Sequence, residues 1–161
     1  MTILNIYVKP YLAAYARSRY STGMPDVVRF PAASLVNHTI INKLTKRPDG
    51  AEPREGNLMV LVNDKVPGCK DFTQYNFLPL TGETAVNNAL LMNFDAHLHF
   101  YMDRKRYDDG IDYKDSADAF IQLYGLEGLI SADALLKKHV RWKSMVRAYR
   151  QEPIQLEMKL Q

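Results

Sequence analysis

The sequence predicts an α+β fold, with a small sheet and helices in residues 1–80 and a C-terminal bundle of three helices in residues 81–161. Two observations support this division: short β-forming runs occur in the first half, and long segments with a helical period dominate the second. The composition is that of a globular protein, 47% hydrophobic and 24% charged. A chain of 161 residues is long enough for two small domains or one continuous domain.

The first half alternates β-forming runs with helical patterns. Because proline favours the first turn of a helix, Pro10 and Pro31 indicate where two helices begin. The run Leu58–Val62 is apolar without alternation, which predicts a strand covered on both faces and central to the sheet. The expected elements are a strand at 3–8, a helix at 11–20, a strand at 27–30, a helix at 31–44, a strand at 58–62 and a shorter strand at 72–80.

The second half is predicted to hold helices at 81–106, 115–125 and 131–150. The last two are joined by a short glycine-containing turn, which is the outline of a helix-turn-helix and equally of any helical hairpin. Ser131 is expected to cap the final helix, and Pro153 to end it close to Gln151. One stripe of this helix should face the core, because its members step by four, three, four and three: Leu135, His139, Trp142, Val146 and Tyr149.

The final helix is strongly basic, with six Lys or Arg and one Asp between Ser131 and Arg150. Positive charge gathers at both ends of the chain, while residues 107–130 contain six acidic residues and one basic residue. Basic clusters of this kind favour polyanions such as nucleic acid. The alternative interpretation is a solvated last helix whose charges have no ligand.

DNA is therefore the partner that the charge pattern predicts, bound through phosphate contacts. Arg17 and Arg19 in the first half are expected to assist. The expected DNA-binding residues are Lys137, Lys138, Arg141, Lys143, Arg147 and Arg150 on the final helix, with Arg104, Lys105 and Arg106 on the helix at 81–106.

No motif indicates catalysis, a cofactor or a metal. The chain has no Gly-rich phosphate loop and no His-Glu-x-x-His motif, and the lone Cys69 excludes a disulfide within one chain. Asp95, His99 and Asp103 line one side of a helix, but they span about 12 Å, so charge-assisted pairs are a better interpretation than a metal site. The carboxylates from Asp108 to Asp118 lack the closing Glu of an EF-hand and suit turn formation and helix capping.

Three short strings carry a resemblance to a known family. They are Lys9-Pro10-Tyr11-Leu12, Val28-Arg29-Phe30-Pro31, and Tyr75, Asn76 and Leu78, followed by a basic helical end. In this outline the chain resembles a family of short uncharacterised bacterial proteins from prophage or mobile-element gene clusters. The resemblance implies a mobile-element context and a DNA-associated accessory role. The tail QEPIQLEMKLQ departs from the more densely basic tail of that family, which lowers the expected DNA affinity.

The sequence thus predicts a cytoplasmic, non-enzymatic DNA-binding accessory protein that does not associate with a membrane. No 18-residue apolar run occurs, and the stretch MTILNIYVKP lacks the charged lead and apolar core typical of a signal peptide, so we expect neither a membrane span nor export. The alternative is a structural or adaptor protein of a phage-like assembly that binds a protein partner or a second copy of itself. Ten tyrosines suit such an interface, although they suit a core as well.

Overall fold

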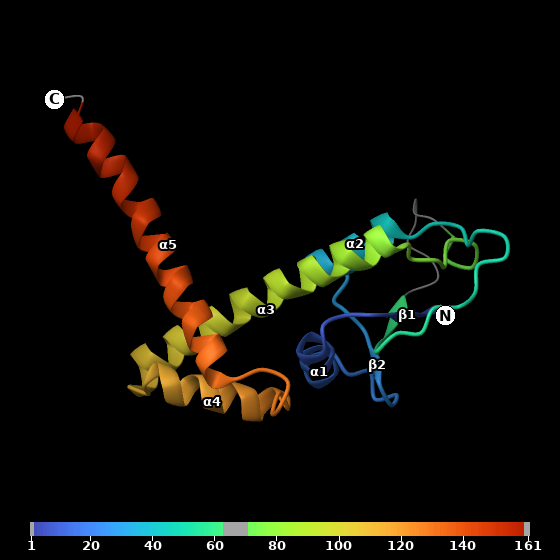
Figure 1. Cartoon of the computed structure of the whole chain (residues 1–161), viewed down its shortest axis with the longest axis horizontal. Coiled ribbons are helices and arrows are strands. Elements are labelled where there is room, and N and C mark those ends of the chain that lie inside the picture. Colours follow the sequence, from blue (N-terminus) through green and yellow to red (C-terminus); the bar gives the residue numbers. More distant parts are fainter. Residues whose placement is uncertain (1, 63–70, 160–161) are drawn as a thin grey trace. The chain divides into compact units, whose positions relative to one another are not determined.

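The computed structural model describes residues 2–62 and 71–159, the last nine of these as backbone only. Within these residues the chain forms one three-stranded sheet and five helices, which confirms the α+β class and the helical C-terminal half (Figure 1). Cys69 lies outside the described residues. No helix in the described ranges is both long and apolar enough to cross a membrane.

The residue contacts divide the chain into two units. The first comprises Met1–Asp95 with Tyr124–Leu126, and the second comprises Ala96–Leu123 with Glu127–Gln161. The long helix α3 (Leu80–Asp109) contributes residues to both units.

The sheet of the first unit has the order β1-β3-β2. The central strand β3 (Leu58–Val62) pairs antiparallel with β1 (Thr2–Ile6) and parallel with β2 (Val27–Val28). Four of its five residues are buried, so the prediction of a covered, central strand is confirmed. The first unit also contains the two helices α1 (Pro10–Arg19) and α2 (Leu35–Lys43).

An aromatic cluster fills the core of the first unit. Tyr15 of α1 is fully buried, and its ring meets the edges or faces of Phe94, Tyr124 and Tyr20 at centroid distances of 5.0, 5.1 and 6.3 Å. The Tyr20 hydroxyl donates a hydrogen bond to Asn93 Oδ1 at 2.9 Å. Several of the ten tyrosines therefore pack in the core, so they are not evidence for a surface that binds a partner protein.

Three predictions for the first unit were wrong in detail. The helix expected from Pro31 begins at Leu35, because the Ser34 hydroxyl accepts a hydrogen bond from Asn37 N and caps it there. The strand expected at 27–30 is two residues long. Residues 72–80 form no strand: the backbone turns at Asp71, whose carbonyl accepts two backbone N–H groups, and one isolated bridge joins Phe77 to Thr45.

The second unit consists of the end of α3, then α4 (Tyr113–Tyr124) and α5 (Ala132–Lys159). Its core contains Leu98 and Met102 of α3, Phe120 of α4 and Leu135 of α5, all fully buried. Gly125, at a φ of 63°, adopts the left-handed conformation that ends α4.

The predicted cap of α5 is confirmed, whereas its predicted end is wrong. Ser131 Oγ accepts a hydrogen bond from Ala134 N at 3.1 Å. The helix then continues past Pro153 to Lys159. Proline removes one backbone donor and clashes with the preceding turn, but the other hydrogen bonds of a long helix can carry it across one such position.

Candidate functional site

The helix α5 has two parts with different surroundings within the second unit. In its first part, Leu135 and His139 have no exposed surface, and Trp142 is half-buried. Further along the same stripe, Tyr149 is 78% exposed. The predicted core stripe is therefore correct at Leu135 and His139 and wrong at Tyr149, because α3 and α4 cover only the first part of the helix.

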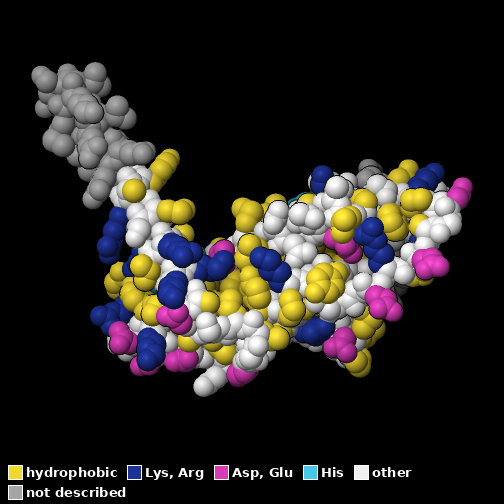
Figure 2. All heavy atoms as spheres, viewed as in Figure 1, with side chains coloured by type: hydrophobic (Ala, Val, Ile, Leu, Met, Phe, Trp, Pro, Cys, Tyr) yellow, Lys and Arg dark blue, Asp and Glu magenta, His cyan; other side chains and the backbone are white. Residues whose placement is uncertain are grey.

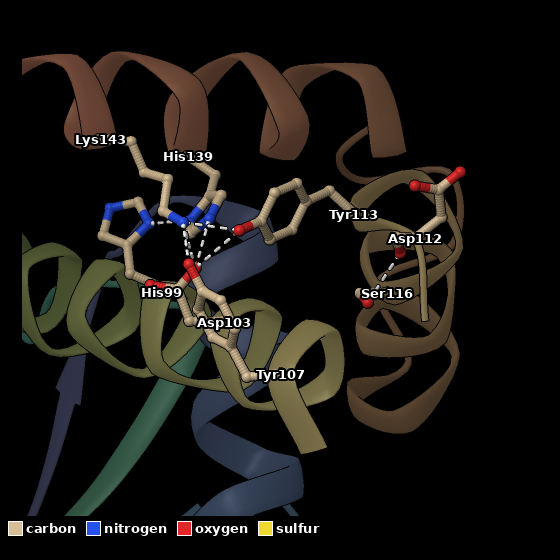
Figure 3. A network of polar contacts seen from close by, with 8 residues as sticks. All are labelled: His99, Asp103, Tyr107, Asp112, Tyr113, Ser116, His139 and Lys143. Carbon is tan, nitrogen blue, oxygen red and sulfur yellow. Dashed lines mark hydrogen bonds and ion pairs between the residues drawn. The ribbon is translucent and has the colours of Figure 1, made fainter. Parts of the chain in front are cut away.

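Asp103 of α3 is the centre of a polar network that fixes this first part (Figure 3). Its Oδ1 accepts from three donors on two other helices: Lys143 Nζ at 2.9 Å, Tyr113 OH at 3.1 Å and His139 Nε2 at 3.2 Å. Lys143 Nζ also contacts the hydroxyls of Tyr113 at 2.6 Å and Tyr107 at 3.3 Å. One carboxylate thus joins α3 to both α4 and α5.

Two histidines extend the network into the core. The Nδ1 atoms of His99 and His139 lie 3.0 Å apart. Because His139 Nε2 faces the Asp103 carboxylate, the consistent neutral arrangement has His139 donating from Nε2 and accepting at Nδ1 from His99. The His99 ring also stacks on Trp142, with centroids 4.4 Å apart and planes inclined by 9°.

The network settles the protonation states of its members. Burial lowers the pKa of His139 from its ordinary value, and the attraction of Asp103 offsets this only in part. Burial opposes charge on Lys143, but hydrogen bonds with Tyr113 and Asp103 outweigh it and raise the pKa of the ammonium group. Burial likewise opposes charge on Asp103, yet hydrogen bonds from Lys143 and Tyr113 lower the pKa of the carboxyl. The stable state near neutral pH is a carboxylate, an ammonium and neutral imidazole.

Lys143 was expected to contact DNA, and the structure places it in this network. Its side chain is 22% exposed and its charge is paired with Asp103. A phosphate would have to displace a carboxylate and two tyrosine hydroxyls to reach it. Lys143 therefore serves the attachment of α5, which makes it a weak candidate for phosphate binding.

Other predicted basic residues are also paired. Lys137 forms an ion pair with Asp133, one turn earlier on α5. At the end of α3, each of the three predicted residues has a carboxylate partner: Arg104 pairs with Asp108 and Lys105 with Asp109 one turn later in the same helix, and Arg106 pairs with Asp112 just after it. These pairs are exposed and screened, so they leave the residues reachable by solvent while reducing the local positive charge.

The two arginines of the first unit that were expected to assist DNA binding, Arg17 and Arg19, have contacts within the chain as well. Arg17 pairs with Asp26 and donates to the backbone carbonyl of Asn57. Arg19 lies 5.7 Å from the ring centroid of Tyr20 and 6.0 Å from that of Tyr15. Both side chains have a structural explanation.

Three predicted residues remain exposed and have no ion pair with any residue whose side chain is described: Arg141, Arg147 and Arg150. They lie on α5, which has six basic residues and no acidic one between Asp133 and Glu152. Lys138, on the same stretch of helix, is half-buried. Figure 2 shows basic and hydrophobic side chains next to one another on α5, below its grey end. This stretch of α5 is the candidate nucleic-acid interface.

The acidic and histidine side chains of the described residues form no cluster of metal-ligand type. Among the residues that the structure describes, no group of three His, Cys, Asp or Glu side chains is placed to hold a metal ion. Within the line of Asp95, His99 and Asp103, His99 turns to His139 and Asp103 turns to Lys143. In the network the Lys143 ammonium group neutralises the Asp103 carboxylate, and the two histidines are hydrogen-bonded to each other.

The sequence places His139 on the core stripe but does not indicate its partners. The spacing of Asp103 predicts charge-assisted pairs on a solvated helix, and no sequence pattern indicates a role for Tyr113. The available signal was His139 itself, because a histidine on an otherwise apolar stripe needs hydrogen-bond partners once it is buried. The sequence cannot show which carboxylate lies opposite it.

No family model matches the chain, and neither a curated protein nor a solved structure matches it.

Proposed function

We propose that this chain is a non-enzymatic DNA-binding accessory protein of a prophage or mobile element, which contacts phosphates through α5. The observation that carries the proposal is the group Arg141, Arg147 and Arg150, exposed on a helix stretch without a carboxylate. Guanidinium groups are well suited to phosphate because they are always charged and donate in a planar fork. A cytoplasmic location, where DNA is accessible, belongs to the same proposal.

The arginines that are best placed for DNA lie on the back of α5. At about 100° per residue, Ser144 is opposite the buried Leu135, and Arg141 and Arg147 each lie about 60° from Ser144. The back of the helix is thus basic while its front is attached to α3 and α4. Phosphate binding on the back leaves the Asp103 network intact.

Docking differs from that of a helix-turn-helix recognition helix. The connection between α4 and α5 comprises the seven residues 125–131, whereas that motif uses three or four. The first turns of α5 are the part that packs on α3 and α4. We therefore expect phosphate contacts along the helix and little reading of base sequence.

The test is the salt dependence of binding to a fluorescently labelled DNA duplex, measured by anisotropy between about 50 and 200 mM salt. Log affinity should fall with log salt at a slope near −0.9 per phosphate contact. Replacing Arg141 and Arg147 by Ala should flatten the slope by about two units, if each contacts one phosphate. The melting temperature should stay the same, since both side chains are exposed.

Lys114→Ala is the matched control, because Lys114 is an exposed basic residue on α4. It should leave the slope unchanged. If the wild-type chain shows no salt-dependent binding even at low salt, or if Lys114→Ala flattens the slope as much as Arg147→Ala, the proposal fails.

A further inference from the structure

The front of α5 beyond the attached part carries an exposed apolar strip, defined by Trp142, Met145, Val146 and Tyr149. Met145 is 68% exposed and Tyr149 78%, while Trp142 and Val146 are half-buried. The strip lines a hollow of about 490 Å³, together with Ala148 and Arg150. Large apolar side chains grouped in this way on a surface mark interaction sites more often than single exposed ones do.

The charges beside the strip indicate what can cover it. Arg141 and Arg150 lie about 90° to either side of its midline, taken at 100° per residue. No carboxylate occurs on α5 between Asp133 and Glu152. The strip is therefore an apolar surface with a cationic border on both sides.

This border disfavours two occupants. A second copy of α5, laid along the strip in either direction, would bring arginines against arginines with no carboxylate between them. A lipid surface needs a long apolar helix face, and this strip extends over only about two turns, with Trp142 held against His99. The remaining occupant with complementary chemistry is an apolar helix face bordered by carboxylates.

We propose that the apolar strip of α5 is the docking site for an acidic amphipathic helix of a protein partner. Such a helix would place Leu, Ile or Val side chains at i, i+3 or i+4, and i+7 into the hollow, with Glu or Asp on both borders facing Arg141 and Arg150. Such a docking site would be the partner-binding surface of the alternative function, an adaptor protein. It does not rest on DNA binding: Arg141 and Arg150 belong to both proposals, but the apolar strip lies on the front of α5 and Arg147 on the back, so each proposal has residues of its own.

The probe is a synthetic 21-residue peptide with Leu at heptad positions a and d, Glu at e and g, and Ala elsewhere. The control peptide has Lys in place of every Glu. Trp142 is the sole tryptophan of the chain and a member of the strip, so its fluorescence reports directly on occupancy. Titration with the acidic peptide should give a saturable blue shift of the emission at micromolar concentrations, and the Lys peptide should bind at least tenfold more weakly.

Two variants locate the site. Replacing Met145 and Tyr149 together by Ala should weaken peptide binding at least tenfold without lowering the melting temperature. Arg150→Glu should reduce the preference for the acidic peptide over the Lys peptide at least fivefold. Arg147→Ala should weaken DNA binding while leaving peptide binding unchanged, and the Met145/Tyr149 variant should do the reverse. Failure of one proposal is thus distinguishable from failure of the other.

Four outcomes overturn the inference. Two concern the peptides: equal binding of the acidic and Lys peptides, or no shift of the Trp142 emission even at millimolar acidic peptide. The third is a peptide-free dimer, found by sedimentation, in which the Trp142 emission is already blue-shifted, and the fourth is an emission shift on phosphatidylglycerol vesicles that is larger than the shift with peptide. The third would assign the strip to a second copy of the chain, and the fourth to an anionic membrane.

Discussion

The two parts of α5 have the same sequence pattern and different surroundings. Leu135 and His139 are buried against α3 and α4, whereas Met145 and Tyr149 are exposed on the continuation of the same helix. The spacing of apolar residues is helical throughout. Periodicity therefore determines which residues share a face of a helix but not whether another element covers that face.

Charge divides along the helix in a similar way. In the attached part, Lys143 has a carboxylate partner on α3 and Lys137 one on α5. Arg147 and Arg150, further along, have no ion pair with any residue whose side chain is described. Lys137 and Lys143 are thus used in ion pairs, while Arg147 and Arg150 beyond the core are exposed, as is Arg141 on the back of the attached part. The predictions below test this division of α5 into an attached part and a free part.

The largest effect is expected where α5 meets the core. Leu135 is fully buried, so Leu135→Ala removes its apolar contacts and leaves a cavity among the helices of the second unit. Unfolding should become easier by about 2–5 kcal/mol. Chemical denaturation monitored by circular dichroism measures this value. A loss below about 1 kcal/mol would mean that α5 is attached by the polar network alone.

The next effect concerns the carboxylate that joins the helices. Asp103→Ala leaves Lys143, Tyr113 and His139 without their shared acceptor, and removal of such an acceptor costs about 1–3 kcal/mol. The lower end of that range applies, since Asp103 and Lys143 are both partly exposed and water can replace the lost contact.

Asp103→Asn separates geometry from charge. The amide oxygen can still accept hydrogen bonds, so this variant should recover part of the loss, as measured in the same denaturation assay. If the Asn and Ala variants are equally destabilised, the negative charge is the property that matters. If neither is destabilised, the network contributes nothing to the attachment of α5.

Much of the fold could be predicted from the sequence, because it follows from local rules. The run LMVLV has no alternation and forms the central strand, and Ser131 caps the helix that follows it. The polar network could not be predicted, because Asp103, Tyr113 and His139 come from three helices and meet through tertiary packing alone. The predicted end of α5 near Gln151 was wrong for a related reason. Pro153 removes one backbone hydrogen bond, but the rest of a long helix can continue past that position.

The stability of the attached part of α5 should depend on pH through His139. The pKa of His139 is lowered by burial, so the unfolded chain takes up this proton more readily than the folded chain. Stability from the neutral imidazole is therefore present above the unfolded value of 6.5 and is lost as pH falls below it. The groups facing the ring are His99 and Asp103 of α3, Tyr113 of α4 and Lys143 of α5.

The measurement is the melting temperature between about pH 7.5 and 5.5. The wild-type protein should lose stability across this range, and His139→Gln should flatten the decline because it removes the titrating ring. His38→Gln, on the exposed surface of α2, is the matched control and should leave the slope unchanged. An unaltered slope in His139→Gln would show that its protonation is not linked to folding.

The smallest effect is expected at the free part of α5. Tyr149 lies on the same stripe as Leu135, yet it is 78% exposed, so Tyr149→Ala removes little buried surface. The free energy of unfolding should change by at most about 0.5 kcal/mol, measured by the same denaturation assay as for Leu135→Ala. A loss above about 2 kcal/mol would mean that Tyr149 is covered in solution, either by another part of the chain or by a second copy. Repeating the measurement at two protein concentrations separates these cases, because only coverage by a second copy makes the stability depend on concentration.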